Sequence, residues 1–337
     1  MKNSYFALSR EQQRRVVEQG AVKHNLPKHA IEKDLWVSAM LHIIFSLPCA
    51  RSLVFKGGTS LSKVWNLIHR FSEDIDLAID RAMFSFEGDL TKKQVKSLRK
   101  VSSIFVRDTL VKQLNDSISG SPLSQLCEIQ AQADGVGDIT YPEPRIIYVK
   151  YKSVFDDRLS YIEPEIKIEA GSRSLLEPTV DVSISSLIET AIPSISTTMA
   201  ITSVKTAVPE KTFLEKAFLL HELFSVCDNV PARRRSRHIY DLSMMIKGGV
   251  AEKAISNDEL WETISYHRST LTGIQGVDYT PDIRNRIQLV PPHQSLENWQ
   301  YDYDEMSGAM IYNNPPSFAQ LVESMRSLEQ MFRNRDR

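Results

Sequence analysis

Two carboxylates lie one residue apart inside an apolar segment, in the stretch DIDLAI at residues 74–79. On a β-strand, side chains two residues apart point to the same face, so Asp74 and Asp76 are expected to project together while Ile75 and Leu77 enter the core. Neighbouring carboxylates raise each other's pKa unless a cation lies between them. A hard divalent cation such as Mg²⁺, or Mn²⁺, suits oxygen ligands and brings nucleotide phosphates with it. The pair therefore predicts a metal–nucleotide site, although surface charge is the commoner explanation of such a pair taken alone.

A glycine-rich turn precedes this pair by the length of a short helix. Residues Gly57, Gly58, Thr59 and Ser60 fall between an apolar run and a helical pattern. Glycines at the start of a helix leave backbone N–H groups unpaired and let a phosphate approach closely, and the helix N-terminus favours an anion. The two hydroxyls add phosphate contacts, or one of them simply caps the helix. The turn and the acidic pair together predict one device that holds phosphates against a metal ion.

A third carboxylate is available in the stretch EIKIE, residues 165–169. Glu169 and Lys167 alternate with isoleucines, so they share one face of a predicted strand. On a strand beside the acidic pair, Glu169 joins the two aspartates as a metal ligand and Lys167 meets a phosphate. The alternative is an ordinary sheet with one solvated face.

Charged residues also interrupt apolar helical patterns further along the chain. Lys216 lies within FLEKAFLLHELF, where a buried lysine is costly, so it reaches either a polar cleft or the solvent. Asp241 is flanked by apolar residues and is open to an i, i+4 pair with Arg237. The run ARRRSRH at 232–238 is either a solvated loop and helix start or a contact to RNA phosphates.

The elements that position these residues follow from hydrophobic periodicity. Helices are predicted at residues 9–21, capped at Ser9, and at 27–47, 61–69 and 89–119; strands are predicted at 52–55, 75–79, 145–154, 163–170 and 179–185. After about residue 205 every pattern is helical. We therefore expect an α+β fold with a domain at 1–200 and a mainly helical domain at 201–337.

The bulk composition indicates a water-soluble globular protein. The chain has 337 residues and a formal net charge of -1, so any nucleic acid must be held by a local patch. Its three cysteines match neither a zinc site nor a disulfide framework. No apolar run reaches membrane-spanning length and the N-terminus does not resemble a signal peptide, so we expect a cytoplasmic protein without a membrane partner.

The stretches FKGGTSLSK and RFSEDIDLAI resemble the AbiEii/AbiGii toxin family of nucleotidyltransferases, which includes the MenT toxins and belongs to the DNA polymerase β-like superfamily. IEKDLW at 31–36, FLEKAFLLHE at 213–222, RHIYDL at 237–242 and YDYDEM at 301–306 resemble further motifs of this family. Thr59 replaces the usual serine and Glu169 an acidic residue that is often aspartate. The resemblance implies a polymerase β-like core, a small mixed sheet with helices, followed by the helical domain.

The resemblance also implies roles for individual residues. Asp74, Asp76 and Glu169 are the metal ligands and, with Lys216 and Asp241, the catalytic residues. The nucleotide phosphates are held by the turn and by nearby cations; these residues are Lys56, Gly57, Gly58, Thr59, Ser60, Lys167 and Arg237. In this scheme Lys216 neutralises phosphate charge, and Asp241 completes the site from the helical part.

The function implied is that of an EC 2.7.7-type nucleotidyltransferase toxin in a bacterial toxin–antitoxin or abortive-infection system. It transfers a nucleoside monophosphate from an NTP to an acceptor, for which the MenT resemblance suggests the 3′ end of tRNA, and an antitoxin is encoded alongside. Two alternatives remain open at this point. One is a non-catalytic interaction protein that binds GTP or another NTP; the other is an antibiotic-modifying enzyme with a small-molecule acceptor.

Overall fold

The chain forms two compact units. The computed structural model describes residues 3–72, 74–136, 139–156, 163–197, 203–227, 230–312 and 314–336. The first unit comprises residues 1–64 and 73–206, and the second comprises residues 65–72 and 207–337. Residues 65–72, which follow the glycine turn and precede the acidic strand in sequence, therefore belong to the second unit. The division at residue 200 remains a prediction about domains; the contacts change unit after Thr206.

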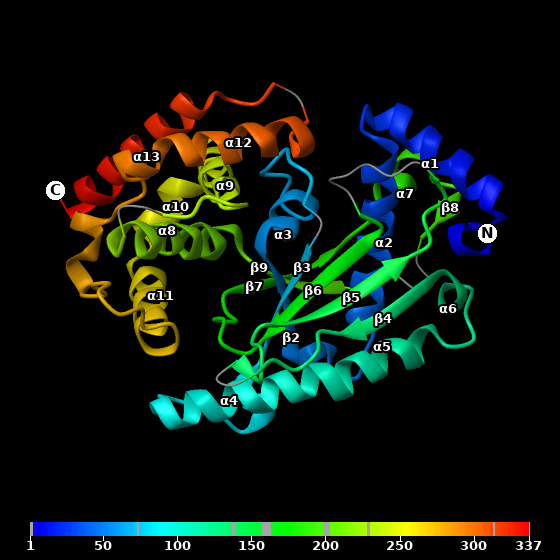
Figure 1. The fold of residues 1–337 in the computed structure, drawn as a ribbon, viewed down its shortest axis with the longest axis horizontal. Helices are drawn as coiled ribbons and strands as arrows, with labels where there is room; N and C mark the ends of the chain where they lie inside the picture. The colour runs from blue at the N-terminus through cyan, green and yellow to red at the C-terminus, as the bar shows by residue number, and fades with distance from the viewer. Residues whose placement is uncertain are drawn as a thin grey trace. The chain divides into compact units, whose positions relative to one another are not determined.

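A seven-stranded mixed sheet forms the centre of the first unit, with strand order β4-β5-β6-β3-β2-β9-β7 (Figure 1). β3 runs antiparallel to β2 and parallel to β6, and β5 is antiparallel to both β4 and β6. The sheet strands are β2 (Leu53–Lys56), β3 (Asp74–Ile79), β4 (Cys127–Ala131), β5 (Arg145–Tyr151), β6 (Glu165–Gly171), β7 (Thr179–Ser183) and β9 (Ser203–Ala207). A separate parallel pair consists of β1 (Asn3–Ser4) and β8 (Ile195–Ser196). The five predicted strands are confirmed as β2, β3, β5, β6 and β7, whereas β1, β4, β8 and β9 were not predicted.

One face of this sheet is buried under helices. Ile75 and Leu77 of β3 and Ile166 and Ile168 of β6 are almost fully buried and belong to one hydrophobic cluster with residues of α2 (Lys28–Ile44) and α5 (Val111–Ile118). The intervening residues of β3 and β6 point to the opposite face because side chains alternate along a strand. The polar side chains of β3 and β6 in the predicted site therefore lie on the face opposite the apolar core.

α1, α2 and the basic helical segment of the first unit begin and end within a few residues of the predicted positions. α1 (Arg10–His24) starts at Ser9, whose hydroxyl forms a capping box with Gln12, as the sequence predicts. The basic segment forms α4 (Lys92–Ile104) and α5, which are joined by a π-helical turn at Phe105–Leu110. Two short helices, α6 (Leu123–Leu126) and α7 (Leu187–Ala191), complete the set in the described part of this unit.

The predicted helix at 61–69 is wrong in its extent. α3 spans Gly57–Lys63, and the chain then leaves the helical path, with Asn66 at a φ of 50°. Trp65 donates its indole N–H to the carbonyl of Ala207 at 3.2 Å, and Ile68 is buried within the second unit. Tertiary packing of these apolar side chains outweighs the weak helical preference of the segment.

The second unit is helical after residue 207, as predicted (Figure 1). Its helices are α8 (Pro209–Ser225), α9 (Ser236–Lys247), α10 (Val250–Ser256), α11 (Asp258–Leu271), α12 (Leu296–Met310) and α13 (Phe318–Arg333). Short 3₁₀ turns occur in both units, at Tyr5–Ala7, Ala50–Ser52, Arg81–Phe84, Pro281–Arg286, His293–Ser295 and Asn334–Asp336. None of the helices in the described ranges has the length and apolar character needed to cross a membrane.

The motif IEKDLW, residues 31–36 in α2, holds the C-terminal end of α3 in place. Asp34 of α2 accepts a bond from the Lys63 ammonium at 2.6 Å and another from the backbone N–H of Leu187 at 2.7 Å. Both side chains of the ion pair are shielded from solvent. The end of α3 is therefore held to α2 and to the start of α7 by one carboxylate.

We expect Asp34→Ala to lower the free energy of unfolding by about 3 kcal/mol, because it leaves the shielded Lys63 ammonium without its anion. The matched control is Asp116→Ala, which removes an exposed i, i+4 partner of Lys112 and should cost no more than about 0.5 kcal/mol. Urea unfolding followed by circular dichroism measures both. Equal losses for the two variants would contradict this role of Asp34.

Candidate functional site

The glycine turn and the acidic strand meet at Gly57 and Asp76. β2 ends at Lys56, which is the antiparallel partner of Asp76, and the chain then enters α3 through Gly57. Gly57 has a φ of 78°, which favours glycine. A Cβ built on Gly57 would lie only 1.9 Å from Asp76 Oδ2. The backbone of the turn thus approaches the carboxylate closely enough to exclude any side chain at position 57.

The two hydroxyls of the turn bind backbone atoms. Thr59 Oγ1 donates to the carbonyl oxygen of Asp74, and Ser60 Oγ donates to the carbonyl oxygen of Gly57 at 2.8 Å. Both residues are buried. The first bond ties α3 to the start of the acidic strand, and the second closes the turn on itself. The hydroxyls therefore rigidify the turn, and their phosphate contact remains a prediction.

The third carboxylate lies on the strand next to the acidic pair. In the parallel ladder between β3 and β6, Asp74 is opposite Lys167 and Asp76 is opposite Glu169. Paired residues of neighbouring strands point to the same side of a sheet. All four residues are partly buried, in contrast to the buried isoleucines between them. The structure thus brings together the site residues predicted in the first unit.

This face has the chemistry of a site for a hard cation. The available ligands are carboxylate oxygens, which Mg²⁺ and Mn²⁺ prefer. The missing side chain of Gly57 leaves room for the Asp76 carboxylate itself, which lies directly against the turn. Across the described ranges, the side chains as placed do not form a ready group of three or more His, Cys, Asp or Glu ligands. The three carboxylates are of the type that a hard metal ion binds, and they share one face of the sheet.

Lys216 and Asp241 meet within the second unit. Lys216 Nζ lies 2.9 Å from Asp241 Oδ2, and Asp241 is fully buried. The same carboxylate binds Arg70, whose Nε lies 2.7 Å from Oδ1 and whose Nη2 lies 2.9 Å from Oδ2. The Asp241 carboxylate is thus bound by the bidentate Arg70 guanidinium and by the Lys216 ammonium.

Burial and charge act in opposite directions on these groups. Burial alone raises the pKa of the Asp241 carboxyl, but Arg70 and Lys216 outweigh it and hold that pKa well below its usual value. Burial lowers the pKa of Lys216, and Asp241 offsets this only in part. The pKa of His238, whose Nδ1 lies 3.4 Å from Lys216 Nζ, is lowered well below its usual value, chiefly by desolvation. His238 is therefore neutral at physiological pH.

The basic run at 232–238 leads into α9. Arg233 and Arg234 are exposed, whereas Arg237 lies on the first turn of the helix and its charge acts on Lys216. Asp302, in the motif YDYDEM of α12, accepts from the backbone N–H of Arg234 at 2.5 Å and from that of Ser236 at 3.0 Å. This motif thus anchors the start of the helix that carries Asp241.

Arg70 and Asp302 were not identified from the sequence as site residues. Arg70 directly precedes the Phe-Ser of the stretch RFSEDIDLAI, so a cation close to the acidic pair in sequence was an available signal. Asp302 offered only its place in the motif YDYDEM, because a carboxylate on an amphipathic helix is normally solvent-exposed.

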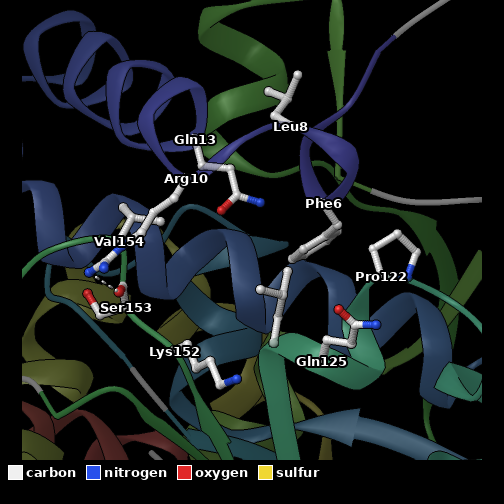
Figure 2. A pocket seen from close by; sticks show the side chains of 10 residues that line it. Phe6, Leu8, Arg10, Gln13, Pro122, Gln125, Lys152, Ser153 and Val154 are labelled. Carbon is white, nitrogen blue, oxygen red and sulfur yellow. Dashed lines mark hydrogen bonds between the residues drawn. The ribbon is translucent and has the colours of Figure 1, made fainter.

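A separate hollow of about 420 Å³ opens in the first unit between the N-terminal segment and the end of β5. Figure 2 shows Phe6, Arg10, Gln13, Gln125 and Lys152 around it. Arg10 forms an ion pair with Asp156 at 2.8 Å. The residues lining this hollow include none of the predicted site residues.

Comparison with known proteins decides the family. The family model "Nucleotidyl transferase AbiEii toxin, Type IV TA system" matches residues 40–324. This chain belongs to the AbiEii nucleotidyltransferase toxin family. Its members are toxins of type IV toxin–antitoxin systems and EC 2.7.7-type enzymes, so the predicted family and enzyme class are confirmed. Membership also implies an NTP substrate and an antitoxin partner.

The fold of this AbiEii protein resembles that of a solved toxin. The nucleotidyltransferase toxin MenT4 of Mycobacterium tuberculosis matches with a TM-score of 0.54 and 16% identity, over 98% of this chain and 94% of that chain. At this identity the match shows the fold, and the predicted α+β fold is confirmed. A search of curated protein sequences finds no significant relative.

We expect Gly57→Ala to destabilise the first unit by more than the roughly 1–2 kcal/mol that a positive φ costs an L-residue. The added methyl group must also displace the Asp76 carboxylate. The control is Gly88→Ala, because Gly88 has a φ of 60° but no atom within 4 Å of a built Cβ. Thermal unfolding of the two variants measures the difference. A loss at Gly57 no larger than that at Gly88 would show that the close approach to Asp76 is absent.

Proposed function

We propose that this toxin transfers a nucleoside monophosphate from an NTP to the 3′-terminal hydroxyl of a tRNA. The observation that carries the proposal is the approach of Gly57 to Asp76, since a Cβ at 57 would lie 1.9 Å from Asp76 Oδ2. Carboxylates that lie against the start of a helix suit a nucleotide whose charge is neutralised by a cation. Neither feature alone has this implication.

Asp74, Asp76 and Glu169 are the residues proposed to hold Mg²⁺ or Mn²⁺. Their support is the strand register, which pairs Asp76 with Glu169, together with the all-oxygen ligand set. When bound, the ion supplies charge neutralisation on the phosphates and lowers the pKa of the attacking hydroxyl.

The other residues of the site orient the nucleotide and neutralise its charge. Gly57 and Gly58 present backbone N–H groups at the start of α3, while Lys56 and Lys167 flank Asp76 and Asp74 in the strand ladder. The acceptor oxygen attacks the α-phosphorus, the bond to the bridging oxygen of the β-phosphate breaks, and pyrophosphate leaves. The acceptor hydroxyl gives its proton to the Glu169 carboxylate in the same step.

Lys216, Asp241 and Arg237 keep the roles that the family resemblance implies. Asp241 holds the Lys216 ammonium at 2.9 Å, and the cluster carries one more positive than negative charge once Arg70 is included. A buried excess of positive charge favours an anion such as a phosphate. We propose that Lys216 neutralises charge on the departing pyrophosphate and that Arg237 adds to the same field.

We expect Asp74→Asn and Asp76→Asn each to lower the transfer rate at least about 100-fold, because each removes a charge proposed to act on the reacting phosphates. The assay incubates the protein with each α-labelled NTP, Mg²⁺ or Mn²⁺ and total RNA, and counts label in RNA. Asp80→Asn is the control: Asp80 directly follows β3, and its side chain accepts from the Ala82 N–H, which asparagine can also do. Chelation by EDTA should stop transfer and added Mg²⁺ should restore it. Transfer that survives either site substitution would refute the assignment.

We expect the label to reside on the terminal diol of tRNA. Periodate oxidation of the RNA destroys that diol before the assay, so labelling of oxidised tRNA should fall to background while untreated tRNA is labelled. Label that persists on oxidised RNA would show a different acceptor. Labelling of a small molecule with no label in RNA would favour the antibiotic-modifying alternative.

A further inference from the structure

Arg70 binds Asp241 with the geometry of a rigid fork. Its Nε and Nη2 donate to the two different oxygens of the carboxylate, at 2.7 Å and 2.9 Å. Arg70 is 3% exposed and Asp241 is 0% exposed, so neither charge is screened by water. Parallel bonds from a planar guanidinium fix both the position and the plane of a carboxylate, whereas a lysine supplies only a point charge.

The backbone of Arg70 is fixed as firmly as its side chain. Arg70 forms an isolated antiparallel bridge with Ile311, flanked by a bond from the N–H of Phe71 to the carbonyl of Met310 at 2.7 Å. The N–H of Tyr312 donates to the carbonyl of His69 at 3.2 Å. Arg70 Nη1 donates to the carbonyl of Phe71 at 3.2 Å. The guanidinium is therefore attached to a segment that cannot shift without breaking several bonds of the second unit.

The oxygen that Arg70 fixes is also the oxygen that holds Lys216. Asp241 Oδ2 lies 2.9 Å from Arg70 Nη2 and 2.9 Å from Lys216 Nζ. The carboxylate thus transmits the position of Arg70 to the lysine. In the proposed function, Lys216 neutralises the charge on the departing pyrophosphate. The position of its ammonium therefore affects the rate of nucleotide transfer.

We propose that Arg70 is a positioning residue of the transferase: it locks the Asp241 carboxylate, which in turn places the Lys216 ammonium for a phosphate group of the nucleotide. This inference rests on the proposed function for the role of Lys216. It assigns Arg70 a role in the rate of the chemical step, beyond the stability that any buried ion pair gives.

The second unit contains a matched pair that separates positioning from stability. Arg268 binds Glu222 with the same bidentate geometry, Nε to Oε1 at 2.7 Å and Nη2 to Oε2. Both side chains are shielded from solvent, and neither belongs to the predicted site. Arg268→Lys therefore removes an equivalent fork without touching Lys216 or Asp241.

We expect Arg70→Lys to lower kcat by about 10- to 100-fold, because a small misplacement of a catalytic group has an effect of this size. The KM for NTP should change by no more than about threefold, since the lysine acts on the departing phosphates. Arg268→Lys should lower the thermal midpoint to a similar extent while keeping kcat near the wild-type value. A kcat of Arg70→Lys equal to that of Arg268→Lys would overturn the proposal.

The pH profile adds a readout that a purely structural role would not move. The charged groups acting on Lys216 are Asp241 and Arg237 of α9 and Arg70 of the 65–72 segment, and Arg70 lowers the pKa of Lys216. The titratable His238 of α9 also faces it, with Nδ1 3.4 Å from Nζ. Arg70→Gln should therefore raise that pKa and move the loss of activity at alkaline pH to higher pH. Arg70→Lys keeps the positive charge and should leave the pH at which activity is lost unchanged. If activity is lost at the same alkaline pH in the Gln and Lys variants, Arg70 does not act on the pKa of Lys216.

The effect of Arg70 on the pKa of Lys216 can be measured without any nucleotide-transfer activity. The rate at which acetic anhydride labels Lys216, read by mass spectrometry across pH, follows the fraction of neutral amine. Arg70→Gln should shift the half-maximal labelling to higher pH, and Arg268→Gln should not. Wild-type protein that is inactive with every NTP and acceptor refutes the proposed function, whereas an unshifted labelling curve refutes the role of Arg70.

Discussion

The close approach of the Gly57 backbone to the Asp76 carboxylate is the constraint on which the first unit's site depends. A side chain at position 57 would occupy the place of Asp76 Oδ2. Lys56 is paired with Asp76 in the ladder, so the strand that ends at the turn and the strand that carries the carboxylate cannot slip past each other without turning every side chain to the other face. The register of β2 and β3, the conformation of the turn and the position of the Asp76 carboxylate therefore depend on one another.

Alternation along the strands places the apolar core residues on one face of the sheet and the polar residues of the proposed site on the other. Ile75 and Ile168 lie side by side in the core, and their sequence neighbours Asp76 and Glu169 lie side by side on the other face. Because both strands run in the same direction, the isoleucine pair that packs against the helices also sets the charged pairs on either side of it, Asp74 with Lys167 and Asp76 with Glu169. The second of these pairs brings like charges together, an arrangement that is unfavourable unless a cation accompanies them.

In the second unit the charge that needs stabilisation is the buried carboxylate of Asp241. A fully buried carboxylate is unfavourable without partners, and Asp241 has two cations, Arg70 and Lys216. One of these comes from a segment that the sequence places between the glycine turn and the acidic strand. The same eight-residue segment, 65–72, is what ends α3 early, so the short helix and the buried ion pair have one cause. Asp302 plays a supporting part by fixing the first turn of α9.

The sequence by itself determined strands β2, β3, β5, β6 and β7, the starts of α1 and α2 and the composition of the acidic face, whereas β4 and β9 were not predicted. Alternation in DIDLAI and EIKIE is a local property, and Ser9 caps its helix through a bond to a residue three positions away. The family resemblance was equally local, resting on short motifs. These features need no knowledge of distant residues.

Only the tertiary structure decided the extent of α3, the partners of Asp241 and the task of the turn hydroxyls. Arg70 and Asp241 are 171 positions apart, and Thr59 reaches the backbone of Asp74 across a change of chain direction. Helical periodicity through residue 69 was outweighed by burial of Ile68 in the second unit, a gain that no local pattern records. Long-range pairing depends on which buried charge finds which partner, and that is a property of the folded chain.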